Sequence, residues 1–158
     1  EVLKRPDEYA TDSSSSEDVV RHTLSSVKQK FDYIIFLQPT SPLRNAEDID
    51  AAFELFFGSK ATSLISVCEV DNKLYKAFKE DDNGYLSGIF NNQYPFMRRQ
   101  DLPKAFMSNG AIYIIEVDSF LKNNSFYSNK TVSYQMPEER SVDIDSKEDL
   151  DRIDSQKI

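Results

Sequence analysis

The stretch FDYIIFLQPTSPLR, residues 31–44, decides the fold. Its first half, Phe31 to Leu37, is a short run rich in aromatic and β-branched residues, which is the pattern of a strand buried on both faces of a parallel sheet. Pro39 and Pro42 end this strand, because proline cannot donate a hydrogen bond to a sheet ladder and fixes its own φ angle. We therefore expect a strand that runs directly into a stiff polar loop, residues 38–44.

A helical pattern precedes this strand. Residues 11–16 form a polar, serine-rich turn, and Glu17 and Asp18 follow it. Serine caps with acidic residues in the first turn are typical of a helix start. Apolar residues then recur at helical spacing, which predicts a helix over about Ser15–Lys30.

A second helix and a second strand follow the loop. Asn45 is placed to cap a helix, with Asp48 three residues on, and Gly58 ends the apolar periodicity. Ser63–Val67 is the next apolar run. Helices and strands that alternate with short links predict an α/β sheet.

The second half of the chain is less regular. Leu74–Lys79 and Tyr85–Phe90 flank an acidic turn at residues 81–84 and predict a hairpin, while residues 93–107 are irregular and contain prolines. The remaining elements are predicted as a strand, a short helix, a strand and a capped terminal helix, at Ala111–Val117, Ser119–Asn123, Thr131–Met136 and Ser146–Asp154. Ser146 and Asp149 stand in capping-box positions for the last of these.

Composition sets the class of protein. The chain has 158 residues and a formal charge of −8, which fits one globular domain and argues against a nucleic acid or an anionic membrane as partner. No apolar run approaches the length of a membrane span, and no signal-peptide pattern is present. We expect a cytoplasmic, bacterial protein.

The loop after the first strand is one candidate binding site. Ligands of open α/β sheets bind beyond the carboxyl ends of the strands, so Gln38 and Arg44 are expected at such a crevice. The carboxamide of Gln38 offers a donor and an acceptor, which suits the edge of a nucleobase. The alternative is a proline-rich loop whose polar groups satisfy their own backbone.

Two carboxylates near the carboxyl end are a candidate metal site. Asp143 and Asp145 are two residues apart, so in an extended chain they share a face. Paired oxygen ligands suit Mg²⁺, which keeps waters and bridges to substrate phosphates. The alternative is that these acids precede a helix for reasons of capping and dipole alone.

Two further segments carry candidate groups. Arg98–Pro103 holds the densest positive charge on an acidic chain, and arginine forks bind carboxylates and phosphates; a solvated arginine pair is the alternative. Asn109–Gly110 is predicted as a turn before a strand, although the Asn109 amide can also face a ligand.

Taken in order, these motifs resemble the acylneuraminate cytidylyltransferases, also called CMP-sialic acid synthetases. The resemblance covers nearly all of the chain and rests on Arg5 through the serine turn at 11–16, on residues 38–44 and 98–103, on 109–114, and on 141–145. It implies a Rossmann-like nucleotide-diphospho-sugar transferase fold, a mainly parallel sheet flanked by helices. It also implies a small β-rich subdomain at about residues 74–106 that forms a homodimer.

The resemblance further implies a reaction in which the anomeric hydroxyl of a sialic acid-like sugar attacks the α-phosphorus of CTP. Mg²⁺ or Mn²⁺ is the implied cofactor. The implied roles of the residues are metal binding for Asp143 and Asp145, catalysis for Asp145, Arg99 and Lys76, nucleotide binding for Ser16 and Gln38, and sugar binding for Arg99, Asn109, Tyr113, Phe126 and Tyr127.

The chain departs from the family pattern in three respects. Met107 and Leu74 stand where an arginine and a proline are frequent, which bears on the identity of the sugar. The N-terminal Ala-Arg-x-x-Ser-Lys-type loop, which cradles the triphosphate, and its strand are absent from these residues. Two alternatives to the synthetase therefore stay open. One is a truncated or degenerate domain that binds a sugar acid and dimerises without catalysis, and the other is an enzyme for legionaminic or a related acid.

Overall fold

The computed structural model describes residues 2–11 and 14–155. Asp12 and Ser13 of the predicted serine turn lie outside the described residues. The α-helices are α1 (Ser16–Ser26), α2 (Ala46–Gly58), α3 (Val117–Asn123) and α4 (Lys147–Ser155), and the strands are β1 (Tyr33–Phe36), β2 (Ser63–Val70), β3 (Phe78–Glu80), β4 (Leu86–Gly88), β5 (Ala105–Glu116) and β6 (Thr131–Gln135). Short 3₁₀ helices, among them η2 (Asn72–Lys76), η3 (Tyr94–Phe96) and η4 (Arg99–Asp101), lie between them.

The main sheet has the strand order β1-β5-β2-β6, and its pairing differs from the prediction. β5 pairs antiparallel with both β1 and β2, whereas β2 and β6 are parallel. β1, β2 and β6 therefore run in one direction, as expected, but β5 lies between β1 and β2 and runs against them. The prediction of a mainly parallel sheet was wrong because β2 and β5 form the two legs of one long excursion of the chain, and adjacent strands joined in this way run antiparallel.

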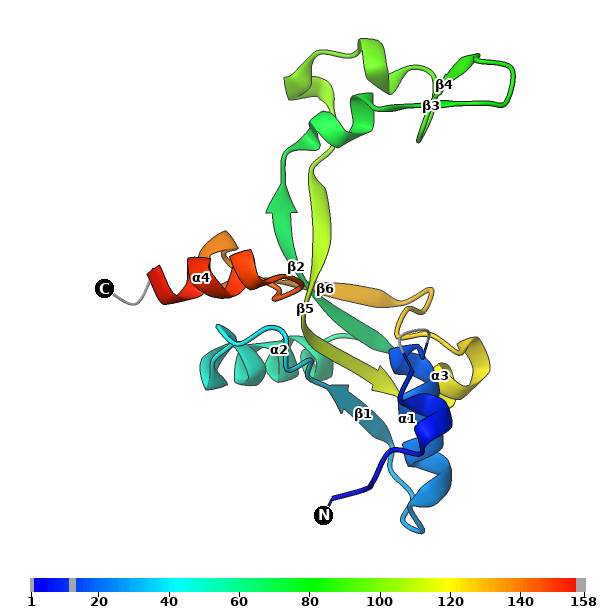
Figure 1. The fold of residues 1–158 in the computed structure, drawn as a ribbon, viewed down its shortest axis with the longest axis vertical. Coiled ribbons are helices and arrows are strands. Elements are labelled where there is room, and N and C mark those ends of the chain that lie inside the picture. Colours follow the sequence, from blue (N-terminus) through cyan, green and yellow to red (C-terminus); the bar gives the residue numbers. More distant parts are fainter. Residues whose placement is uncertain (1, 12–13, 156–158) are drawn as a thin grey trace.

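Helices cover the sheet on two sides (Figure 1). On one side α2 packs over a core that includes Phe56, Leu64 and Ile112. On the other side α1 and α3 enclose a second core around Ile115, Phe120 and Phe126. The α/β class is thus confirmed.

β1 is more exposed than its sequence predicts. The side chains of Tyr33 and Ile35 are 41% and 43% exposed, although an apolar run of this kind was expected to be buried on both faces. The reason is its place at the end of the described strand order, where β5 is its only partner within the described residues.

Residues 71–104 form an arm that projects from the body (Figure 1). The long strands β2 and β5 leave the main sheet side by side, and the predicted hairpin is confirmed at the far end as the antiparallel pair β3 and β4. The hairpin turn has Gly84 at a φ of 83°, and Asp81 Oδ1 accepts the N–H groups of Asn83 and Tyr85.

Local capping chemistry explains where the helices begin. The capping box of Asn45 and Asp48 is present at α2, and Ser15 accepts the Asp18 N–H at the start of α1. The predicted pair at α4 is also confirmed, since Asp149 Oδ2 accepts the Ser146 N–H at 3.0 Å and Ser146 Oγ accepts the Asp149 N–H at 3.3 Å. α1 ends at Ser26, earlier than predicted, where Val27 turns to an extended backbone.

Candidate functional site

A pocket of about 310 Å³ opens beside the end of β1. It brings together segments from α1, β1, β2, β5 and the link between α3 and β6. Five of the residues predicted to contact the nucleotide or the sugar line it: Ser16, Gln38, Tyr113, Phe126 and Tyr127.

Aromatic side chains shape this pocket. Phe126 stacks on Phe36 with ring centroids 5.0 Å apart, and Tyr113 packs against both rings. Tyr113 Oη also shares a hydrogen bond of 2.9 Å with Ser108 Oγ. Tyr127 also lines the pocket but differs from these neighbours because it is 60% exposed.

Gln38 lines the pocket and also lies near Asp143, one of the two candidate metal ligands. A Cβ atom built on Gly110 would lie 2.5 Å from Gln38 Oε1 and 3.2 Å from both Asp143 Oδ2 and Ser41 Oγ. Gly110 has a φ of 73°, which other residues rarely adopt. The side chains of Gln38, Ser41 and Asp143 thus converge on Gly110, in the space that a Cβ atom would occupy.

Asn109 and Gly110 lie inside β5, where a turn was predicted. The pairing of β5 with β2 shifts register opposite Ile65 and Val67, which marks a bulge at this point. Asn109 is only 4% exposed. Its Oδ1 accepts the Ser66 hydroxyl at 2.6 Å, and its Nδ2 donates to Ser141 Oγ at 2.9 Å. The Asn–Gly signal was misread because these buried contacts hold the pair in the strand.

The segment after Ser141 carries the two candidate metal ligands. The Ile144 N–H donates to Thr40 O at 2.8 Å, which fixes the segment against the loop of residues 38–44. Asp143 Oδ1 is buried and has no hydrogen-bond partner among the described residues. Asp145 is exposed.

The Oδ1 of Asp143, unpaired within the described residues, fits the role of a cation ligand. A buried carboxylate oxygen without a donor is costly unless a cation or a bound ligand satisfies it. Within the described residues no group of three His, Cys, Asp or Glu side chains is arranged to hold a metal. One or two carboxylates are nevertheless sufficient for Mg²⁺ when substrate phosphates and waters supply the other ligands.

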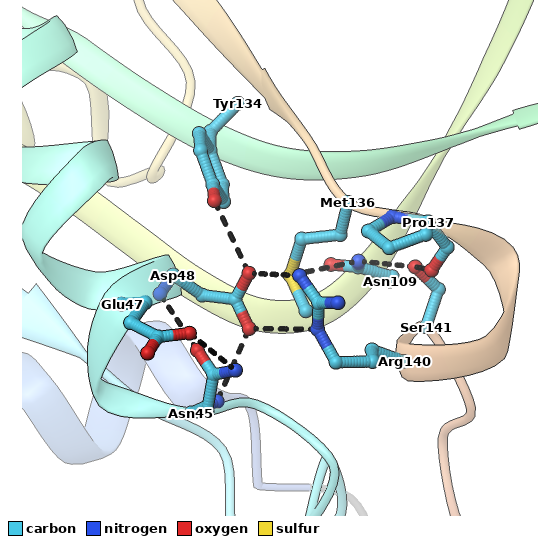
Figure 2. A network of polar contacts seen from close by, with 9 residues as sticks. All are labelled: Asn45, Glu47, Asp48, Asn109, Tyr134, Met136, Pro137, Arg140 and Ser141. Atoms are coloured by element: carbon cyan, nitrogen blue, oxygen red, sulfur yellow. Dashed lines mark hydrogen bonds and ion pairs between the residues drawn. The ribbon is translucent and has the colours of Figure 1, made fainter.

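An ion pair between a buried acid and a partly exposed arginine lies next to this segment (Figure 2). Asp48, 1% exposed, accepts Arg140 Nη2 at 2.7 Å on Oδ1 and Arg140 Nε at 3.2 Å on Oδ2. Tyr134 Oη and the Asn45 N–H also donate to the same carboxylate. Burial alone would raise the pKa of Asp48, but the hydrogen bonds from Arg140, Asn45 and Tyr134, with the guanidinium charge, lower it. Burial and the neighbouring Asp48 charge raise the pKa of Tyr134.

Two predicted cations lie elsewhere, on the arm. Arg99 lines a separate pocket of about 410 Å³ and pairs with Asp71 at 3.4 Å. Lys76 Nζ donates to the backbone carbonyls of Pro95 and Met97. Neither residue lines the pocket at Gln38 within this chain.

Several lining residues were not singled out from the sequence. Glu17 and Ser125 each stand beside a predicted residue, so proximity along the chain was the available signal. The others come from strands and carry no motif, and the missed set is Glu17, Phe36, Ile65, Ser108 and Ser125.

The chain is similar to known bacterial enzymes along nearly its whole length. It is 32% identical over 149 residues to the N-acylneuraminate cytidylyltransferase of Streptococcus agalactiae serotype V, which covers 94% of this chain and 36% of that protein. It is 31% identical over 150 residues to the CMP-N,N'-diacetyllegionaminic acid synthase of Legionella pneumophila, and 26% identical over 145 residues to the pseudaminic acid cytidylyltransferase of Campylobacter jejuni. These two alignments cover 90% and 92% of this chain, and 62% of each relative.

The resemblance predicted from the motifs is thereby confirmed. The chain spans about a third of the length of the N-acylneuraminate cytidylyltransferases that it matches and less than two thirds of the shorter relatives. No protein-family model matches it. Within the described residues no helix is both long enough and apolar enough to span a bilayer.

Proposed function

We propose that the protein that contains this chain is a cytidylyltransferase for a sialic acid-like nonulosonic acid. The observation that carries this proposal is the convergence of Gln38 and Asp143 at Gly110, beside a pocket lined by Ser16, Tyr113 and Tyr127. An amide for a nucleobase and a carboxylate for a metal-bound phosphate are thus next to a cavity of sugar size. The names of the relatives support the same reaction class.

The reaction is a nucleotidyl transfer. The anomeric oxygen of the sugar acid forms a bond to the α-phosphorus of CTP, the bond from that phosphorus to the bridging oxygen of the β-phosphate breaks, and pyrophosphate leaves with its electron pair. Positioning and charge neutralisation supply most of the catalysis in such transfers. Mg²⁺ or Mn²⁺, when bound, supplies positive charge against the phosphates.

Each of the candidate residues has a proposed role in binding or catalysis. Gln38 and Ser16 hold the cytidine, and the aromatic rings of Tyr113 and Tyr127 hold the sugar. Asp143 and Asp145 hold the cation, and Asp145, which is exposed, accepts the proton of the attacking hydroxyl. Phe126 supports the pocket wall by stacking on Phe36.

The protein is also proposed to act as a homodimer joined through the arm. The arm exposes large apolar side chains, among them Tyr85 (73%), Leu86 (64%) and Phe96 (82%). A set of this kind is typical of a protein interface. Arg99 and Lys76 do not line the pocket of their own chain. In a dimer, Arg99 and Lys76 on one arm would instead bind the substrate in the pocket of the partner.

The test is pyrophosphate release by the intact protein. With CTP, Mg²⁺ and a panel of N-acetylneuraminic, legionaminic and pseudaminic acids, we expect turnover with at least one sugar. Asp143→Asn and Asp145→Ala should each lower kcat by about 100-fold or more, the loss of several kcal/mol of charge stabilisation, while CTP still binds.

The same assay separates the alternatives. Binding of a sugar acid without pyrophosphate release would favour the non-catalytic binding domain. Full turnover in both aspartate variants would remove the metal site from the proposal. A preference for one acid in the panel would identify the substrate, which the pocket alone does not distinguish.

A further inference from the structure

The acidic segment, defined here as residues 137–145, is held on both sides of Asp143. Before Asp143, Ser141 Oγ accepts the Asn109 amide at 2.9 Å and donates to Pro137 O at 2.8 Å. After Asp143, the Ile144 N–H donates to Thr40 O at 2.8 Å. The Asp143 side chain is therefore placed by contacts that its own carboxylate does not make.

The strongest of these attachments is the pair of Arg140 and Asp48 (Figure 2). Its two parallel hydrogen bonds, at 2.7 and 3.2 Å, fix the plane of the guanidinium as well as its distance. Asp48 is buried and its carboxylate receives four donors in all, two of them from Arg140 and the others from Asn45 and Tyr134. Arg140 therefore directs two of its guanidinium N–H donors to Asp48.

The position of Asp48 explains what this pair joins. Asp48 lies in the first turn of α2, and its capping box with Asn45 comes directly after the loop of residues 38–44. Arg140 lies three residues before Asp143 on the acidic segment. The pair therefore ties the end of the loop that carries Gln38 to the start of the segment that carries Asp143.

We propose that Arg140, through its hydrogen bonds to Asp48, is a positioning residue. It fixes the position of the Asp143 carboxylate relative to Gln38. This inference rests on the proposed function, in which Asp143 binds the cation that accompanies CTP. Groups that orient a ligand without touching the metal are typically worth about 10- to 100-fold in metal affinity or activity. Lysine would hold the segment less well, because it keeps the charge but lacks the planar fork.

The test compares Arg140→Met, Arg140→Lys and Asp48→Asn in the intact protein. One measurement is hydrogen–deuterium exchange at the Ile144 amide without metal or substrate. We expect Arg140→Met to speed this exchange by at least about tenfold, because the segment opens locally, while the amides of α3 exchange as in the wild type. Arg140→Lys should give an intermediate rate.

A second measurement is Mn²⁺ binding in the presence of CTP, followed by electron paramagnetic resonance. We expect Arg140→Met and Asp48→Asn to weaken it by about 10- to 100-fold. Arg21→Met is the matched control, since Arg21 is exposed and contacts the side chain of Asn124 far from this segment in sequence. It should leave both measurements unchanged.

Two results would overturn the proposal. One is equal acceleration of all slow amides in Arg140→Met, which would mean general destabilisation. The other is wild-type Mn²⁺ binding in Arg140→Met while Asp143→Asn abolishes it, which would leave the proposed function intact and remove only the role of Arg140. If instead Asp143→Asn binds Mn²⁺ as the wild type does, the metal-binding role of Asp143 in the proposed function is contradicted. The exchange rate of the Ile144 amide then still decides whether Arg140 holds the segment.

Discussion

Gln38 and Asp143 meet at Gly110, where a Cβ atom would lie 2.5 Å from Gln38 Oε1 and 3.2 Å from Asp143 Oδ2. The two side-chain oxygens are therefore separated by no more than the sum of these distances. One comes from the loop after β1 and the other from the segment before α4. Their shared neighbour, Gly110, lies in β5 where its register with β2 shifts, so the sheet itself sets the spacing between the proposed base-binding amide and the proposed metal-binding carboxylate.

Gly110→Ala should therefore impair function as well as folding. The positive φ of Gly110 costs an alanine about 1–2 kcal/mol of stability. The added methyl group would also displace Gln38 Oε1, and we expect CTP affinity to fall by about tenfold, which is about 1.4 kcal/mol. Thermal unfolding and CTP titration of the same variant measure the two effects separately.

Gly84→Ala is the matched control for this substitution. Gly84 has a similar φ of 83°, but a Cβ atom there would meet nothing within 4 Å. It should lose comparable stability and keep its CTP affinity. Equal loss of CTP affinity in both variants would contradict the role given to the space above Gly110.

The buried Asp48 carboxylate predicts a dependence of stability on pH. Its pKa is lowered in the folded protein, so it binds fewer protons there than in the unfolded chain, where the pKa is about 3.9. The stability it contributes is present above that unfolded pKa and is lost as pH falls through the folded pKa. Urea unfolding between pH 3 and 6 should show a steeper fall for the wild type than for Asp48→Asn.

At pH 7 the Asp48→Asn variant should itself be less stable by about 1–3 kcal/mol, since the hydrogen bonds from Arg140 lose their charged acceptor. Asp71→Asn is a suitable control. The pKa of Asp71 is also lowered, chiefly by the Lys73 N–H, but this side chain is exposed and its loss should change the unfolding free energy little. Identical pH slopes for wild type and Asp48→Asn would refute the assignment.

The elements that sequence predicts well are those whose signals are local. The start of α2 follows from Asn45 and Asp48, and its end from Gly58, all within one short stretch. The start of α4 follows in the same way from Ser146 and Asp149. Capping residues bind backbone groups in the adjacent turn, so they can be predicted from the local sequence without knowledge of the fold.

The features that could not be predicted from the sequence depend on contacts between residues far apart along the chain. β5 lies between β1 and β2 because of strand order, which hydrophobic alternation does not encode. The contact of Arg140 with Asp48 joins residues 92 positions apart, and Asp48 was recognised only as a helix cap. Family motifs, in contrast, found half of the residues that line the pocket but not the separation of Arg99 and Lys76 from it.

Phe126 and Tyr127 should respond differently to truncation although they are adjacent. Phe126 is 6% exposed and stacks against Phe36, so Phe126→Ala should cost about 3–5 kcal/mol of stability. Tyr127 is 60% exposed, so Tyr127→Ala should unfold as the wild type does while KM for the sugar acid rises by about tenfold at unchanged kcat, as expected for a lost aromatic contact. Unchanged KM in Tyr127→Ala would exclude this ring from sugar binding.

The exposed apolar side chains of the arm predict the oligomeric state. Phe96 is 82% exposed and packs only edge-on to Phe78, with ring centroids 6.3 Å apart, among the ring contacts of the described residues. If a second copy covers this face, a charge placed there has to be desolvated on association, so Phe96→Glu should shift the intact protein from dimer to monomer in light scattering. Leu121→Glu on α3, an exposed apolar position outside the arm, should stay dimeric. Because Arg99 and Lys76 are proposed to act across the dimer, kcat of Phe96→Glu should fall with the monomer fraction and recover at high protein concentration. A fully active monomer would contradict the action across the dimer, and a Phe96→Glu variant that stays dimeric would contradict the interface on the arm.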